Sequence, residues 1–229
     1  MIVIDELIRT KRKSIALIVE RDGRLIVRAP MRMKEAVIRE LVEKKASWIQ
    51  AKQHYAKTTY PPYVPKEYVN GEGFWYLGKI YRLEMRMSTS VGEKFDTPLV
   101  LNGTFNLSST ALPQAESVFT QWYKQQAYQV ISERAAWYAA RHGYTYQRVK
   151  ITSARTRWGS CASNGTLSFT WRLVMAPVPV IDYVVVHELA HLKVKDHSKA
   201  FWSKVKLMMP DYEQRIEWLE VNGHLLRLE

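Results

Sequence analysis

Residues 177–191 read PVPVIDYVVVHELAH, and this stretch decides the fold of the second half of the chain. Its valines and isoleucine are β-branched, so local preference alone favours a strand. Its last five residues favour a helix, because His187 and His191 are four positions apart and side chains at that spacing project from one face of a helix. We therefore expect a helix that is apolar on nearly all sides and buried in the protein.

A third histidine, His197, follows six positions after His191. Catalytic zinc sites usually take three protein ligands and leave a fourth position for a water molecule, whose pKa falls to about 7. His187, His191 and His197 supply that number of ligands. The carboxylate of Glu188 can reach the bound water as a general base. The pattern predicts one Zn²⁺ ion per chain, with Glu188 as the catalytic residue.

The position of His197 also constrains the backbone. In an uninterrupted helix six residues turn through about 600°, which would direct His197 about 120° away from His191. The chain must therefore turn between the two histidines. Asp196 or Ser198 is suited to cap a new helix after that turn, and Pro210 is suited to open a further one.

The composition is that of a globular protein with a basic excess. The 229 residues are 47% hydrophobic, which is enough to bury a substantial core in one large domain or two small ones. Lys and Arg number 34 against 22 Asp and Glu, a formal charge of +12 that favours acidic partners such as nucleic acids, nucleotides or acidic peptides. Charged runs are more often solvated faces, so the charge does not choose among these partners.

Two further features concern compartment and redox chemistry. The opening MIVIDELIRTKRK contains acidic residues and lacks the apolar core of a signal peptide, and the longest uncharged apolar stretch, around LVMAPVPVI, is too short to cross a bilayer. The single cysteine, Cys161, excludes an internal disulfide and a multi-cysteine zinc cluster. We expect a soluble, cytoplasmic protein without a membrane partner.

The first half is predicted to be β-containing with one amphipathic helix. Two β-branched runs around an Asp-Gly pair predict a hairpin over residues 14–29. Apolar residues at helical spacing then predict a helix over 33–56. Alternation predicts two strands about Gly78 and another near residues 98–103. We assign this portion to residues 1–110.

The second half, residues 111–229, is predicted to hold the site. Helical spacing over 113–141 ends at Gly143, a suitable helix terminator. Residues 148–173 then read as two or three strands with an Asn-Gly turn, immediately before the metal helix. The predicted class is α+β, with a β-containing N-terminal portion and a catalytic portion built from a small sheet, the metal helix and C-terminal helices.

Four motifs occur in the order RTRWGSC, GTLSFTWRL, PVIDYVVVHELAHL and DHSKAFW, at residues 155–161, 165–173, 179–192 and 196–202. In this combination the chain resembles the YgjP-like metallopeptidase family of bacterial metal-dependent hydrolases, which is related to SprT-like proteins. The motif-rich similarity covers residues 150–215. The earlier hairpin and helix look similar to the more variable N-terminal part of that family.

The resemblance implies a zincin-like fold for the catalytic portion. It implies that His187 and His191 lie on the active-site helix, that His197 is the third ligand and that Glu188 is the base. It also implies peptidase activity, which the residue pattern does not establish by itself, because fold and metal do not choose a substrate.

Two other zincin branches offer different ligand sets. Metzincin proteases share the spacing from His191 to His197, but they have glycine where this chain has Val194, and they have a further methionine turn, so we do not assign that branch. In the glutamate-ligand branch the third ligand comes from a later helix, which would be Glu213 or Glu217 here. The DHS context of His197 favours the histidine.

The RWGSC segment is the second candidate for function. Arg157, followed by Trp158, is suited to hold a substrate carboxylate or phosphate beside the metal. The alternative is a structural turn with a buried tryptophan, and Arg157 is the better single candidate. Cys161 has no identifiable base, so a structural cysteine is favoured over a thiol nucleophile. Three histidines lack any ligand spacing: His54, His142 and His224.

These observations predict a zinc-dependent hydrolase, with peptidase activity first because of the resemblance. The main alternative is a metal-dependent nucleotide pyrophosphohydrolase, favoured by the +12 charge and by Arg155, Arg157 and Arg172 near the predicted site. A third interpretation is a nucleic-acid-associated protease similar to SprT-like enzymes, which would bind nucleic acid through its basic surface. The expected substrate is therefore a peptide or a nucleotide.

Overall fold

β-branched residues near the start of the chain form a three-stranded sheet. Its strands are β1 (Glu6–Thr10), β2 (Ala16–Val19) and β3 (Leu25–Pro30), in the order β1-β3-β2. β3 pairs antiparallel with β2 and parallel with β1. The hairpin predicted over residues 14–29 is confirmed, although its turn residue Asp22 lies outside the described residues. The pairing of β1 was not predicted.

Two helices follow where one was predicted over residues 33–56. α1 (Glu35–Lys44) and α2 (Ala46–Thr59) are separated by Lys45, whose φ of −107° and ψ of 13° leave the helical region. The prediction of a single helix was wrong, because the apolar period continues across Lys45 and does not report the break in the backbone. The buried hydrophobic cluster of this part consists of Leu25, Val27, Ala29, Ile38, Val42 and Ile49.

The computed structural model describes residues 2–20, 23–59, 64–87 and 97–228. The chain divides into two compact units, Met1–Val64 and Pro65–Glu229. This division falls earlier than the expected boundary after residue 110, because the strands that follow the first unit share a hydrophobic core with the later helices.

A four-stranded sheet opens the second unit. Its strands, in the order β4-β5-β7-β6, are β4 (Gly73–Tyr76), β5 (Lys79–Arg86), β7 (Thr104–Ser108) and β6 (Leu99–Asn102). β4 and β5 form the hairpin predicted about Gly78. β6 is the strand predicted near residues 98–103, whereas β7 was not predicted.

The turn of the β4–β5 hairpin packs on the segment that precedes the metal helix. The N–H of Leu77 donates to the carbonyl of Val174 (2.9 Å), and the N–H of Gly78 donates to that of Met175 (3.0 Å). Gly78 has a φ of 79°, and a Cβ atom at this position would lie 2.7 Å from Cγ of Pro177. Both the left-handed backbone and the close approach therefore require glycine here.

A 28-residue helix, α3 (Ala115–His142), confirms the helix predicted over 113–141. It follows the 3₁₀ segment η1 (Ser109–Gln114) and ends before Gly143, whose φ is 65°. Its inward face repeats every four residues, as a half-buried helix requires. The fully buried members of that face are Phe119, Tyr123, Ala127, Ile131 and Ala135.

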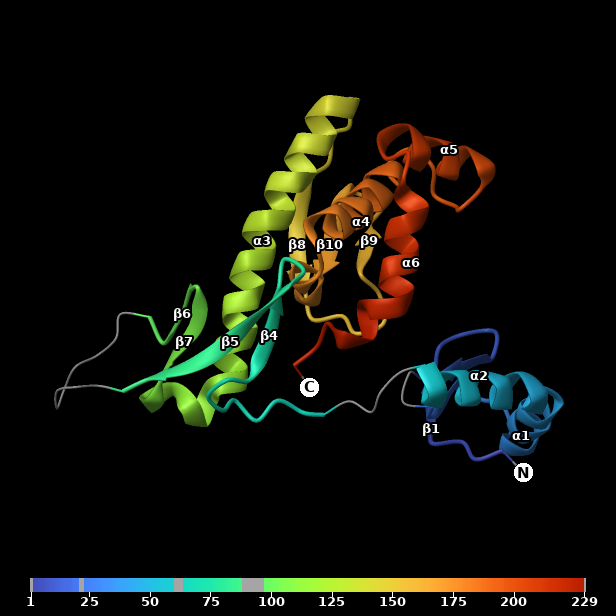
Figure 1. Ribbon diagram of the computed structural model, residues 1–229. Coiled ribbons are helices and arrows are strands. Elements are labelled where there is room, and N and C mark those ends of the chain that lie inside the picture. Colours follow the sequence, from blue (N-terminus) through green and yellow to red (C-terminus); the bar gives the residue numbers. More distant parts are fainter. Residues whose placement is uncertain (1, 21–22, 60–63, 88–96, 229) are drawn as a thin grey trace. The chain divides into compact units, whose positions relative to one another are not determined.

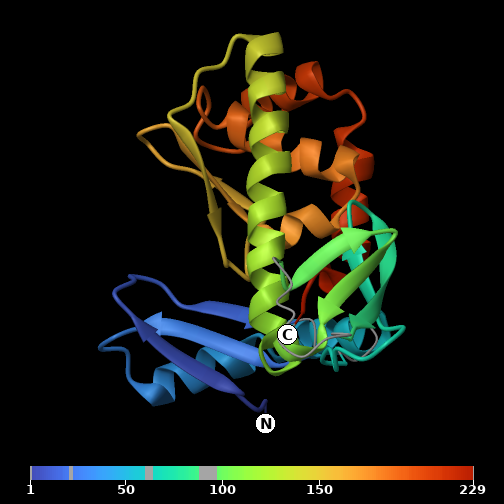
Figure 2. The ribbon, with the colours of Figure 1, turned by 90° about the vertical axis from the view of Figure 1, so that its left-hand side faces the viewer.

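A second small sheet lies along α3 and leads into the C-terminal helices (Figures 1 and 2). In the order β8-β10-β9, the strands are β8 (Arg148–Thr152), β10 (Thr166–Thr170) and β9 (Gly159–Cys161). The elements that follow are η2 (Trp171–Met175), α4 (Val178–Ala190), α5 (Lys199–Met208), α6 (Tyr212–Asn222) and η3 (Gly223–Leu225). The α+β class is confirmed, and the stretch with the HELAH motif is a helix.

An ion pair fastens α4 to α3. Arg134 Nε donates to Asp182 Oδ1 (2.5 Å), and Arg134 Nη2 donates to Asp182 Oδ2 (2.6 Å). The hydroxyl of Tyr138 adds a longer bond to Oδ2 (3.4 Å). Because the Asp182 side chain is only 9% exposed, this bidentate pair supplies the partners that a buried carboxylate needs.

In the described parts of the chain, none of the helices combines the length and the hydropathy that a membrane crossing requires.

Replacing Arg134 with Met should lower the free energy of unfolding by about 3 kcal/mol, because the Asp182 carboxylate stays buried without its charged partner. Urea unfolding followed by circular dichroism measures this change. The double variant Arg134→Met/Asp182→Leu should recover part of the loss, since it removes both buried charges. A loss below about 1 kcal/mol in the single variant would show that the pair behaves as a surface ion pair.

Candidate metal centre

α4 is the element that positions the candidate site. It contacts α3, α5, α6, β9 and η2, so it is covered on nearly all sides, as its apolar sequence requires (Figure 1). His187 and Glu188 lie in its last turn, and His191 is the residue that ends it. The enclosure holds these side chains at the end of a rigid helix.

The predicted turn after His191 is present. The N–H of Val194 donates to the carbonyl of Ala190 (3.0 Å), and the chain then reverses before α5 begins at Lys199. The reversal brings His197 back to the end of α4. His197 Nε2 lies 3.1 Å from His187 Nε2.

The imidazoles of His187, His191 and His197 form a group that can hold a metal ion. One ring nitrogen from each lies within 4.8 Å of the others. With zinc–nitrogen distances of about 2.0–2.1 Å and tetrahedral angles, two nitrogen ligands of one ion lie about 3.3 Å apart, close to the separation of the two Nε2 atoms. Two nitrogen lone pairs repel at this distance unless a proton or a cation lies between them, so the donor set fits a metal ion.

The protonation of two of these histidines, His187 and His191, also fits. Burial and the neighbouring imidazoles lower the pKa of His187 to about 4, and burial lowers the pKa of His191. His191 Nδ1 lies 3.0 Å from the carbonyl of Val194, which can only accept, so Nδ1 carries the hydrogen and Nε2 keeps its lone pair. Neutral imidazole with a free lone pair is the metal-binding form.

A single aromatic ring supports the whole group. Phe201, on α5, is fully buried, and its ring centroid lies 4.9 Å from that of His187, 4.5 Å from that of His191 and 4.9 Å from that of His197. The ring centroid of Trp202 lies 6.0 Å from that of His197. The contact of Phe201 with three histidines was not predicted from the sequence, because it depends on the turn between α4 and α5.

Glu188 is buried against β9. It is 4% exposed, and a Cβ atom at Gly159 would lie 2.6 Å from its Oε1. Within the described residues, its Oε2 has no hydrogen-bond partner. Burial raises the pKa of Glu188 to about 8, partly opposed by the charge of Arg157. A buried carboxyl with an unsatisfied oxygen beside a candidate metal group is typical of a general base.

The RWGSC segment meets this carboxyl at Gly159. Gly159, in β9, leaves the space that the Glu188 side chain occupies, a role that the sequence did not reveal. Arg157 is exposed, whereas Trp158 is half-buried against the main core, where its carbonyl accepts the N–H of Thr170 (3.0 Å). Half-buried Cys161 follows in the same strand, and burial raises the pKa of its thiol.

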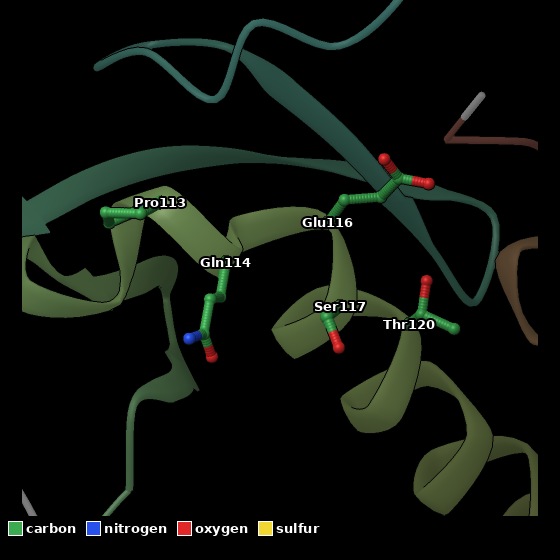
Figure 3. A pocket seen from close by; sticks show the side chains of 5 residues that line it. All are labelled: Pro113, Gln114, Glu116, Ser117 and Thr120. Carbon is green, nitrogen blue, oxygen red and sulfur yellow. The ribbon is translucent and has the colours of Figure 1, made fainter.

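The remaining candidates lie elsewhere. Glu213 and Glu217 are exposed on α6 and belong to no group of metal-binding side chains found among the described residues. His54, His142 and His224 belong to no such group among the described residues either. A shallow hollow at the start of α3 does not overlap with the histidine group (Figure 3). It is lined by Pro113, Gln114, Glu116, Ser117 and Thr120.

The raised pKa of Glu188 predicts how stability depends on pH in the metal-free protein. Between about pH 4.5 and about pH 8 the Glu188 carboxyl is ionised in the unfolded chain but keeps its proton in the folded protein. The free energy of unfolding therefore falls as the pH rises through this range. Glu188→Gln removes this loss. The free energy of unfolding of Glu188→Gln relative to wild type, measured by urea titration with a chelator present, should therefore increase across this range. A difference that stays constant would contradict the assignment.

Comparison with known proteins identifies the family that the sequence matches. Residues 13–222 match the family described as "YgjP-like, metallopeptidase domain". A UTP pyrophosphatase of Escherichia coli (strain K12) is 54% identical over 39 residues, which make up 17% of this chain and 23% of that protein. The crystal structure of the metallopeptidase zymogen of Pyrococcus abyssi abylysin aligns with 42% of this chain and 96% of its own, at 21% identity and a TM-score of 0.38.

The match to the family extends over most of the chain and includes all three histidines and Glu188. The chain belongs to the YgjP-like metallopeptidase family.

Proposed function

We propose that the protein is a zinc-dependent hydrolase in which His187, His191 and His197 hold one Zn²⁺ ion and Glu188 is the general base. The proposal is carried by the convergence of three imidazoles and, next in the chain to His187, a buried carboxyl with an unsatisfied oxygen. Zinc in such a site acts as a Lewis acid and makes water a nucleophile at neutral pH.

The role of Glu188 follows from its surroundings. Without a nearby cation its carboxyl holds a proton up to about pH 8, and a cation at the three imidazoles would lower that pKa and favour the carboxylate. Oε2 then accepts a proton from the attacking water and returns it to the leaving group. Gly159 makes room for this carboxyl, because a Cβ atom there would lie 2.6 Å from Oε1.

For the substrate, a peptide is the first candidate. The family carries the description metallopeptidase, and β9, which lies against Glu188, is an edge strand of its sheet. An edge strand offers backbone N–H and C=O groups to which an extended peptide can pair. A peptide bound along β9 would place its backbone next to the general base.

A nucleoside triphosphate is the second candidate, and the charges around the site favour it. Arg157 interacts electrostatically with Glu188, and Lys195 interacts electrostatically with His191 and with Cys161 of β9. Both cations are exposed. Two exposed cations near the candidate site suit an oligophosphate. The partial match to a UTP pyrophosphatase supports the same substrate class.

Removal of any ligand should remove the metal. His187→Ala, His191→Ala and His197→Ala should each lose the bound zinc measured by elemental analysis, whereas Glu188→Gln should retain it and lose turnover by about 10²–10⁴-fold. His54→Ala, an exposed histidine of the first unit, is the matched control and should retain both. Full zinc in His197→Ala would exclude that residue as a ligand and direct attention to Glu213 and Glu217.

The effect of replacing Arg157 distinguishes the two candidate substrate classes. If the protein hydrolyses UTP, Arg157→Ala should lower kcat/KM for UTP by about tenfold to a hundredfold, because it removes a charge-assisted bond to phosphate. Arg148→Ala, an exposed arginine on β8, is the control and should have no effect. Hydrolysis of casein by wild type, with no release of pyrophosphate from UTP, would establish the peptidase and reject the nucleotide.

A further inference from the structure

One side chain next to the metal centre has no role in the proposed chemistry. Tyr183 precedes His187 by one helical turn on α4 and is 7% exposed. Its hydroxyl oxygen lies 3.4 Å from Nδ1 of His187, and the two rings meet edge to face at 71° with centroids 5.9 Å apart. The hydroxyl therefore faces the imidazole nitrogen that points away from the other histidines.

The direction of the hydrogen bond between Tyr183 and His187 decides whether Nε2 of His187 can bind a metal ion. A neutral imidazole carries hydrogen on one nitrogen only, and His187 Nε2 faces His197 Nε2 at 3.1 Å. Nε2 can offer a lone pair to a metal only when the hydrogen is on Nδ1. The tyrosine oxygen accepts that hydrogen, and the reverse arrangement, with the hydroxyl donating to Nδ1, would put the hydrogen on Nε2 and block the metal.

The neighbouring ligand shows the same arrangement with a different acceptor. His191 Nδ1 lies 3.0 Å from the carbonyl of Val194, which fixes its hydrogen on Nδ1. A backbone carbonyl cannot be removed by substitution, whereas the hydroxyl of Tyr183 can. Burial raises the pKa of Tyr183 to about 12, so this acceptor stays a neutral hydroxyl at ordinary pH.

We propose that Tyr183 is a positioning residue that holds His187 in the tautomer with hydrogen on Nδ1, and so directs Nε2 at the metal. The proposal rests on the three-histidine zinc site proposed above. Partners of this kind set the tautomer and the ring orientation of metal-bound histidines.

Tyr183→Phe tests this, since it keeps the ring and removes only the hydroxyl. The dissociation constant for Zn²⁺, measured by competition with a chromophoric chelator, should rise about 10–100-fold. Tyr76→Phe is the matched control, because it removes a hydroxyl that donates to Gln126 Oε1 (3.0 Å) away from the metal centre, and it should leave zinc affinity unchanged. Equal melting temperatures would show that both variants are folded.

A second readout does not involve metal or turnover. Long-range ¹H–¹⁵N correlation spectra of the metal-free wild type should show His187 with hydrogen on Nδ1, and Tyr183→Phe should show a mixture of tautomers. Hydrogen on Nε2 in the wild type, or zinc affinity of Tyr183→Phe within twofold of wild type, would overturn the proposal. Failure of the wild type to bind zinc would instead reject the proposed metal site, while the spectra would still decide the hydrogen bond.

Discussion

Burial of α4 on nearly every side is the constraint from which the arrangement of the second unit follows. A helix with so few polar side chains is stable only when other elements cover it, and α3, α5, α6, β9 and η2 do so. The same cover removes water from the ionisable groups at its end. It raises the pKa of Glu188 and lowers that of His187, so both groups favour their neutral forms when no metal is bound.

Two buried acidic residues on α4, Asp182 and Glu188, have different roles because their surroundings differ. Asp182 receives two short bonds from Arg134, which satisfies its charge and joins two helices. Glu188, two turns later, has an oxygen without a partner among the described residues and lies against Gly159. A buried carboxylate that is paired with an arginine is a poor proton acceptor. An unpaired carboxylate next to three imidazoles is suited to exchange protons. The stability of the helix and the reactivity of its end therefore depend on different residues.

The parts of the structure that depend on local pattern were predictable from the sequence. Helical periodicity predicted α3, alternation predicted the β4–β5 hairpin, and β-branched runs around an Asp-Gly pair predicted the β2–β3 hairpin. The HELAH spacing correctly overruled the strand preference of α4. The break at Lys45 and the pairing of β1 were missed, because neither leaves a periodic signal. The three histidines lie close together, as their spacing predicted. The roles of Gly159, Phe201 and Tyr183 were not apparent, because each depends on a contact whose distance only the folded chain defines.

We propose that one metal ion binds at the three imidazoles next to Glu188. Anomalous diffraction from crystals of the zinc-loaded protein, recorded on both sides of the zinc absorption edge, tests this most directly. We expect a single peak about 2.0–2.1 Å from Nε2 of His187, His191 and His197, with the Glu188 carboxylate outside bonding distance of the metal. A peak elsewhere, or one bonded to Glu213 or Glu217 in place of His197, would contradict it.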